Sequence, residues 1–439
     1  MSTAVHRNYR WVVLALMVAL TFINYIDRSA LGIVSTYIMK DFNLSNSQYG
    51  IISSAFFVSY AIFCFIGGSA SDFWGPKKTI TISIIAWSLF AAAPVLAWGF
   101  VSLLVARILF GAAEGPVSSV TNKMVNNWFP ATERAKAKGI TDTGMALGAA
   151  ISAPIVGILA FHFNWRVSFV VLMVLGLIWV FFWRRMVTDL PRQHPKVSAA
   201  ELAVIESGRE VEVADGTVAV AQGETQKVPL SFYLRQPIIW VTAVAFFATN
   251  YATYFFLTWF PNYLVTARGL AVSEMAFVNM IPWVFGALGY AGGGFVSDWF
   301  AKKFGDLIKA RRRVISVCLA GAAVSIGLCG MVTTTTAAVA LMSVGIFLLY
   351  LATPSYWAII QDSVVSSSVG RVGGFVHFLS NTAGIFAPAI TGFIVDASGK
   401  FNSAFLLTGV LAAVGCVCVA LFAQPVRKFT PGHDVPVRS

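Results

Sequence analysis

Hydrophobic residues form runs of about 20 positions that recur along the whole 439-residue chain, with short polar stretches between them. Runs of this length suit helices that cross a membrane, because about 20 residues of helix span the hydrocarbon core of a bilayer. We therefore predict twelve membrane-spanning helices. The expected spans cover residues 11–36, 46–70, 79–97, 100–122, 137–160, 166–187, 236–264, 272–298, 313–332, 336–361, 371–395 and 402–424.

The composition agrees with this pattern. Hydrophobic residues make up 57% of the chain and charged residues 11%, whereas soluble domains carry about 25% charged residues. The runs are too long and too uniformly apolar for an outer-membrane barrel, whose strands alternate over about ten residues. The predicted fold class is an all-α membrane protein that contacts the lipid bilayer.

The net charge of +12 follows the connections between the spans. Lysine and arginine gather in alternate loops, and the loops between these hold few basic residues, as the positive-inside rule predicts. This distribution argues against nucleic acid as a partner and predicts that both termini lie in the cytoplasm. The basic segments are residues 6–10, 77–78, 123–138, 184–235, 302–313, 371 and 427–428.

The chain divides into two halves of six spans. We expect an N-terminal bundle at 1–187, a cytoplasmic central loop at 188–235, a C-terminal bundle at 236–425 and a cytoplasmic tail at 426–439. The motif Gly-Gly-x-x-Ser-Asp occurs at residues 67–72 and again at 293–298. A repeat at matching places indicates two duplicated bundles related by a pseudo-twofold axis, with the binding site between them.

The central loop is polar and could not enter a bilayer. A short amphipathic helix at 199–210 is plausible, since Ser198 can cap it and Glu201 follows three residues later. We interpret this loop as a tether without chemistry.

The first span carries an acid and a base side by side, Asp27 and Arg28. Each ionisable side chain at the centre of a bilayer costs roughly 3 kcal/mol even on a lenient scale, so such residues usually have a partner or a function. We interpret the pair as part of a transport site. Two alternatives are an ion pair that only fixes helix packing, and a span whose ends are displaced so that the pair lies at the level of the headgroups.

The fourth span adds Arg107 and Glu114, which are two turns apart and share one helix face, with Gly111 and Gly115 expected to open room beside them. With Asp27 and Arg28 these make two acids and two bases. An anion entering this set would favour protonation of an acid. Arg107 could instead be a gate or packing residue that neutralises Glu114, and Asp27 could merely orient Arg28.

Arg28 is the expected ligand of a substrate carboxylate, because a guanidinium offers two parallel donors and stays charged. The sequence contains no nucleotide-binding loop and no cysteine or histidine spacing typical of a metal site, and its five cysteines lie inside expected spans. We therefore expect no enzyme activity, no metal and no cofactor, with an ion gradient supplying the energy.

The segment Gly68-x-x-x-Asp72-x-x-Gly75-x-Lys77 resembles the loop signature of the major facilitator superfamily, and Gly294-x-x-x-Asp298 resembles its second, degenerate copy. The resemblance implies twelve helices in two pseudo-symmetric six-helix bundles. It also implies a gating role for Asp72, Lys77 and Asp298, through contacts that hold one conformation closed.

A closer resemblance, to the anion:cation symporter family with its bacterial galactonate, glucarate and hexuronate permeases, covers nearly the whole chain outside the termini and central loop. It implies proton coupling through Asp27 and Glu114, anion binding by Arg28, a substrate-facing Tyr60, and a bacterial inner membrane location. We expect the protein to act as a monomer. The motifs that carry it lie at residues 24–29, 114–116, 127–134, 257–264 and 386–392.

The candidates for substrate contact in the second half are neutral, and their hydroxyls, amides and indole edges suit a hydroxylated acid. They are Tyr251, Tyr254, Ser355, Trp357, His377 and Asn381, to which Arg107 and Tyr60 are added from the first half.

Three residues depart from the sugar-acid members of that family. His377 replaces a frequent Asn, Met145 replaces a polar residue, and Asp142 stands where a hydroxyl is expected. These departures argue against a polyol substrate. An organic anion remains the expected substrate class.

We predict a secondary transporter that imports a small organic carboxylate with protons, with a sugar acid such as galactonate, glucarate or a hexuronate as the substrate. An importer of aromatic carboxylates is the alternative. A drug/proton antiporter is more distant, because its proline-glycine signature is only half present at residues 144–154.

Overall fold

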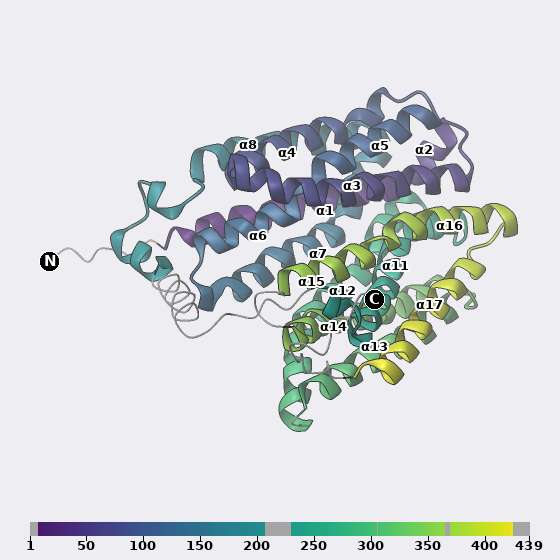
Figure 1. Ribbon diagram of the computed structural model, residues 1–439. Coiled ribbons are helices and arrows are strands. Elements are labelled where there is room, and N and C mark those ends of the chain that lie inside the picture. The colour runs from purple at the N-terminus through teal and green to yellow at the C-terminus, as the bar shows by residue number, and fades with distance from the viewer. Residues whose placement is uncertain (1–7, 207–229, 305, 365–368, 425–439) are drawn as a thin grey trace, which may run out of the picture. The chain divides into compact units, whose positions relative to one another are not determined.

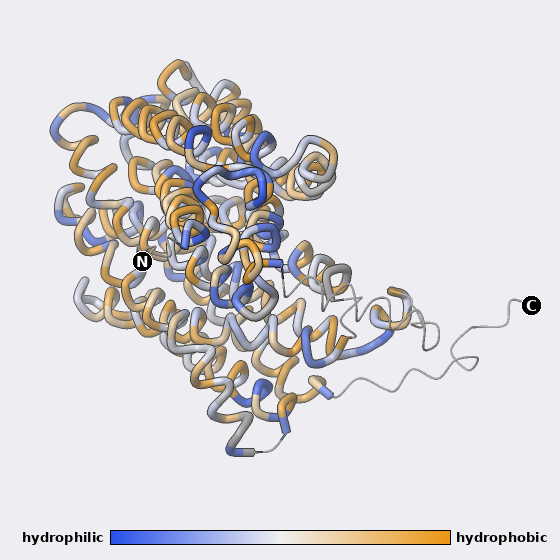
Figure 2. The backbone as a smooth tube through the Cα atoms, turned by 90° about the vertical axis from the view of Figure 1, so that its left-hand side faces the viewer, coloured by the Kyte–Doolittle hydropathy of each residue, from blue (hydrophilic) through white to orange (hydrophobic). Residues whose placement is uncertain are grey.

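The protein is described by a computed structural model, which covers residues 8–206, 230–304, 306–364 and 369–424. Within these ranges all regular elements are helices, and twelve helical segments are long and apolar enough to cross a membrane. Apolar residues follow the helices, and most of the hydrophilic segments lie at helix ends and in connections (Figure 2). The predicted fold class and the twelve spans are confirmed.

The chain forms two compact units. Unit 1 comprises residues 1–44, 51–225 and 272–276, and unit 2 comprises residues 45–50, 226–271 and 277–439. The described part of the central loop, up to residue 206, therefore belongs to unit 1. The predicted tail at 426–439 lies outside the described residues.

Most helices of unit 1 precede the central loop (Figure 1), and η2 lies within it. They are α1 (Arg10–Ile33), α2 (Ser35–Asp41), α3 (Asn46–Trp74), α4 (Pro76–Ala91), η1 (Ala93–Leu96), α5 (Phe100–Glu114), α6 (Pro116–Trp128), α7 (Ala131–His162), α8 (Trp165–Met186) and η2 (Pro191–Gln193). The first few residues of α3 group with unit 2.

Unit 2 contains a short helix at the end of the central loop and the helices that follow this loop, although the first five residues of α12 group with unit 1. They are α10 (Leu230–Leu234), α11 (Pro237–Thr266), α12 (Val272–Phe304), α13 (Leu307–Cys329), α14 (Thr335–Ser363), α15 (Val369–Asn381), α16 (Ala383–Ser398) and α17 (Asn402–Phe422).

Two of the predicted spans, the fourth and the eleventh, are each formed by two α-helices, and α15 and α16 form the eleventh. The fourth span is formed by α5 and α6, which meet at Gly115, and it extends to Trp128 rather than to residue 122. Pro116 has no backbone N–H and occupies the first position of α6, where a helix does not require one. The break places Glu114 at the end of α5, in the middle of the span.

The sequence repeat has a structural counterpart inside each unit. A Cβ atom on Gly67 would lie 2.3 Å from the Cα of Pro116, and one on Gly293 would lie 2.4 Å from the carbonyl oxygen of Leu351 and 3.1 Å from Cδ of Pro354. Each repeated glycine therefore lets the second span of its half approach the fourth closely, next to a proline.

Close contact also joins α1 to α7. A Cβ on Gly144 would lie 2.2 Å from Oγ1 of Thr21, whose hydroxyl donates to the carbonyl oxygen of Thr141 at 2.7 Å. Small residues and a cross-helix hydrogen bond are the usual means by which helices associate in lipid. This packing fixes the helix that carries Asp27 and Arg28.

The central loop does more than tether the two halves. The backbone N–H groups of Tyr9 and Arg10 donate to Glu201 at 2.9 and 3.0 Å, and the N–H of Lys77 donates to Asp189 at 2.7 Å. Two carboxylates after α8 thus cap the first turns of α1 and α4, where unpaired N–H groups favour negative charge.

The predicted helix of the central loop is present at residues 199–206, and its remainder at 207–210 lies outside the described residues. Ser198 accepts a hydrogen bond from the N–H of Glu201 at 3.1 Å, which confirms the predicted cap. His194 stacks on Tyr9 with ring centroids 4.1 Å apart. We call residues 187–206 the docked segment.

Candidate functional site

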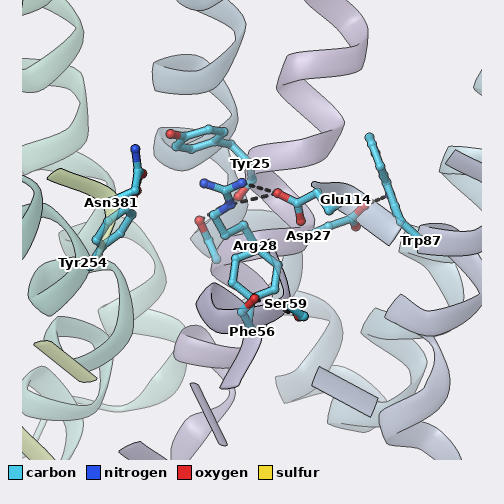
Figure 3. Close-up of polar contacts among 10 residues, drawn as sticks. Tyr25, Asp27, Arg28, Phe56, Ser59, Trp87, Glu114, Tyr254 and Asn381 are labelled. Carbon is cyan, nitrogen blue, oxygen red and sulfur yellow. Dashed lines mark hydrogen bonds and ion pairs between the residues drawn. The ribbon is translucent and has the colours of Figure 1, made fainter. Parts of the chain in front are cut away.

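A buried ion pair inside unit 1 joins α1 to α5. Arg28 donates through Nε to Oε1 of Glu114 at 2.9 Å, and its Nη2 also bonds to that oxygen (Figure 3). Glu114 is fully buried and Arg28 is 7% exposed. Two opposite charges withdrawn from water in this way are stable only as a pair.

Aromatic rings surround the Arg28 guanidinium. Its central carbon lies 5.1 Å from the ring centre of Tyr25, 5.2 Å from Phe56 and 4.7 Å from Tyr60. Such contacts stabilise a cation electrostatically when water is excluded. The predicted residue Tyr60 therefore lies beside Arg28.

Asp27, the neighbour of Arg28, has a different partner. Its Oδ2 accepts a hydrogen bond from the indole Nε1–H of Trp87 on α4 at 2.8 Å, and both side chains are buried (Figure 3). Trp87 is a residue that the sequence analysis missed. A tryptophan in mid-span signals that its N–H requires an acceptor, but the pattern does not identify that acceptor.

Arg107 lies two turns before Glu114 on α5, as the spacing predicts. Its guanidinium carbon is 4.8 Å from the ring centre of Phe56 and 5.0 Å from that of Phe110. Phe56 thus contacts both Arg28 and Arg107. The expectation that Gly111 opens room here is wrong, since a Cβ on Gly111 would lie 2.2 Å from the carbonyl oxygen of Phe56.

The charges of Asp27, Arg28, Arg107 and Glu114 sum to zero when both acids are ionised. Each carboxylate is bonded through one oxygen, while Oδ1 of Asp27 and Oε2 of Glu114 are buried with no hydrogen-bond partner among the described residues. A buried carboxylate oxygen without a donor is costly, and a proton on it would reduce the charge.

Two of the departures from the sugar-acid pattern lie on α7. Asp142 forms an ion pair with Lys138 one turn earlier on the same helix. Met145 follows one turn later on this helix. Asp142 thus adds a charge that Lys138 balances, and the net charge of the region is unchanged.

In unit 2 a hydrogen-bond network joins α11 to α15. The Tyr254 hydroxyl donates to Oδ1 of Asn381 at 2.6 Å (Figure 3). The Asn381 amide donates to the carbonyl oxygen of His377 at 2.8 Å. One turn earlier on α11, Asn250 donates to Ser380 at 3.2 Å. The network brings together three of the predicted residues.

Aromatic rings adjoin this network. His377 lies 5.6 Å from Trp357 and 6.1 Å from Phe246, and Phe246 stacks on Tyr356 at 4.8 Å. The predicted residues Trp357 and His377 therefore lie together. Tyr251 and Ser355 are instead 2% and 0% exposed and lie within the packed interior of unit 2.

The side chains of two predicted gating residues, Asp72 and Asp298, lie outside the described part of the structure. The third, Lys77, lies in the first turn of α4, and its backbone N–H donates to Asp189. Gly75, just before it, has a φ of 82°, a conformation that favours glycine. In the described ranges no group of three histidine, cysteine or acidic side chains could hold a metal ion.

Comparisons with known proteins agree with this architecture. A family model described as the Major Facilitator Superfamily matches residues 17–384 and 287–439. The hexuronate transporter of Bacillus subtilis (strain 168) is 49% identical over 406 residues, covering 92% of each chain. The probable galactarate/D-glucarate transporter of the same organism is 32% identical, covering 98% of this chain and 97% of its own.

A solved structure has the same fold. It is titled as a bacterial homologue of the human lysosomal transporter Spinster, in an inward-facing and occupied conformation. The TM-score is 0.74 at 17% identity, with 95% of this chain and 96% of the other covered. At this identity the likeness concerns the fold alone.

Proposed function

The chain belongs to the major facilitator superfamily and is a membrane transporter, and we propose that it imports a hexuronate, or a closely related sugar acid, together with protons. The observation that carries the proposal is the neutral set of buried charges in unit 1, in which each carboxylate has one oxygen without a hydrogen-bond partner among the residues that the structure describes. The name of the relative that is 49% identical supports the substrate class.

The buried charges of unit 1 explain how proton binding is coupled to substrate binding. Asp27, Arg28, Arg107 and Glu114 are neutral as a set, so a substrate carboxylate adds one negative charge to a buried region. A proton on Asp27 or Glu114 restores neutrality, and a buried net charge is strongly disfavoured. Anion and proton therefore bind best together.

Arg28 is the proposed carboxylate ligand. Its guanidinium is bound to Glu114 in this structure. Protonation of Glu114 weakens that ion pair and makes the forked donors of Arg28 available to the incoming carboxylate. This exchange of partners links the proton to the substrate.

The neutral side chains of unit 2 support a hydroxylated substrate. The Tyr254 hydroxyl and the Asn381 amide supply donors and acceptors without charge, and His377 lies one turn before Asn381 on α15. We propose that the transporter works as a monomer in a bacterial inner membrane, with both termini in the cytoplasm and with the proton gradient, rather than a cofactor, as its energy source.

Uptake of labelled glucuronate into proteoliposomes tests the proposal. An inward proton gradient should drive accumulation, and galacturonate should compete better than benzoate. Competition by benzoate-type acids alone would instead favour an importer of aromatic carboxylates. Uptake that does not depend on the proton gradient would overturn the proposed proton coupling.

A further inference from the structure

The two buried carboxylates of unit 1 are held in different ways. Glu114 is bound by the charged guanidinium of Arg28, whereas Asp27 is bound by the neutral indole of Trp87. An indole N–H only donates, and it neither supplies nor accepts a proton in the transport cycle. Trp87 therefore stabilises ionised Asp27 without neutralising it.

The bond also distinguishes the two oxygens of Asp27. Oδ2 is occupied by Trp87, while Oδ1 is buried with no donor in the described ranges. A proton that adds to Oδ1 leaves the indole bond intact, because the carbonyl oxygen of a neutral carboxyl still accepts. A proton on Glu114, in contrast, weakens an ion pair.

Trp87 differs in this respect from other buried tryptophans of unit 1. Trp179 donates to the carbonyl oxygen of Leu16 on α1 at 3.1 Å, and Trp128 donates to the carbonyl oxygen of Thr188 at 3.0 Å. Trp165 does donate to a carboxylate, that of Asp41, but Asp41 is exposed and also pairs with Arg166.

Few other charges face Asp27. Arg28 follows it directly in the same turn of α1, and Glu114 on α5 acts on it electrostatically. Helix α8, which packs against α1 and α4, has no titratable side chain between Arg166 and Arg184, and α4 has none after Lys78. On α7, Asp142 and Lys138 pair with each other.

We propose that Trp87 is a positioning residue for proton coupling. Its indole N–H fixes the Asp27 carboxylate, reserves Oδ1 as the oxygen that gains and loses the proton, and sets the pH range in which the substrate binds with that proton. The inference rests on the proposed symport and adds the residue that governs its proton site.

Replacing Trp87 by phenylalanine tests this role, because phenylalanine keeps an aromatic ring and lacks the N–H. Without the donor, ionised Asp27 is less stable. The midpoint of the pH dependence of glucuronate binding should move to higher pH by about one unit, as expected for loss of one hydrogen bond to a charged group. Binding is measured by equilibrium titration of the purified protein across a pH series.

Trp179→Phe is the matched control, because it removes an indole bond to a backbone carbonyl of the same helix α1. It should leave the pH midpoint unchanged. If Trp87→Phe destabilises the protein, benzothienylalanine at position 87 deletes the N–H and keeps the bicyclic shape, and the same shift is expected.

A double variant shows whether Trp87 acts through Asp27. Asp27→Asn removes the titrating group, so adding Trp87→Phe to it should produce no further shift of the midpoint. An unchanged midpoint in both position-87 variants would overturn the inference, and so would a full shift in the Asp27→Asn background. Gradient-driven uptake by the wild type is measured separately, so a failure of symport itself is recognised independently of these binding curves.

Discussion

The two units share a repeat but differ in where they hold charge. Gly67 in unit 1 and Gly293 in unit 2 allow the same close approach between the second and fourth spans of each half. Unit 1 nevertheless buries Asp27, Arg28 and Glu114 in mid-span. In unit 2 the described charged residues lie within about two turns of a helix end, and the mid-span network is neutral.

This difference indicates that two duplicated bundles can divide proton coupling and substrate recognition between them. Ionised groups in a membrane are costly, so a protein retains them where a charge must change during function. Neutral amides, hydroxyls and rings suffice to recognise a polar solute. We interpret unit 1 as the coupling half and unit 2 as a contributor to substrate selectivity. Three experiments address this contrast, and a fourth concerns the docked segment of unit 1.

Loss of the buried acid should have the largest effect. Glu114→Gln leaves Arg28 facing a neutral amide, so proton binding no longer balances the substrate charge. We expect gradient-driven accumulation to fall at least about tenfold, the factor that about 1.4 kcal/mol produces in an equilibrium. Glucuronate exchange without a gradient should remain measurable in the same proteoliposomes.

Glu133→Gln is the control for this variant, since Glu133 pairs with Arg10 at the start of α1 and lies outside the buried set. Accumulation by this control should be near that of the wild type. Normal accumulation by Glu114→Gln would remove Glu114 from coupling and break the proposed contrast between the units.

Arg28→Lys should have the next largest effect. Lysine keeps the positive charge but loses the planar fork that can hold a carboxylate through two bonds. We expect the half-saturation concentration for glucuronate to rise about tenfold. Arg166→Lys, which alters the exposed pair with Asp41, should leave it unchanged. A wild-type half-saturation concentration for Arg28→Lys would contradict bidentate binding of the substrate carboxylate by Arg28.

Tyr254→Phe sharpens the comparison from the side of unit 2. It removes the hydroxyl that donates to Asn381 at 2.6 Å and frees that amide to reorient. We expect the preference between glucuronate and galacturonate to change a few-fold, about 1 kcal/mol, while the pH dependence of uptake is unchanged. A shifted pH profile would show that unit 2 also takes part in coupling.

The smallest expected effect concerns the docked segment of unit 1. Burial, with the nearby charges of Lys196 and Lys77, lowers the pKa of His194 below its usual value. Neutral His194 therefore fits the docked state, and docking is strongest above the usual histidine pKa of about 6.5 and weakens as the pH falls below it.

Hydrogen exchange of residues 187–206 across a pH series measures this effect. Exchange should quicken on acidification in the wild type. His194→Phe retains a ring to stack on Tyr9 and cannot titrate, so its exchange, corrected for intrinsic rates, should not change with pH in this range. Equal acid sensitivity in both proteins would assign the effect to another group.

Hydrophobic pattern determined much of the fold. The spans, the duplicated halves and the buried charges were all predictable, because bilayer thickness fixes helix length and a charge within an apolar run is easily recognised. The predicted cap of Ser198 on Glu201 was likewise correct, since it depends on residues three apart. Features that depend on residues close together in the chain could be predicted directly from the sequence.

The hydrogen-bond and ion-pair partners of the site residues could not be predicted from the sequence. The shared helix face of Arg107 and Glu114 left a pairing of these two open, yet Glu114 bonds to Arg28 on another helix. Trp87 gave a signal that its N–H needed an acceptor, and the acceptor lies 60 residues away. Glu201 reaches the start of α1 across 191 residues.

The sequence by itself thus determined that this chain crosses a membrane twelve times, that its halves are duplicated, and which charged groups lie in the apolar interior. The tertiary structure decided which of those groups meet, because glycine contacts between helices fix their rotation and separation. Those contacts arise from side chains far apart in the chain, and no local pattern encodes their geometry.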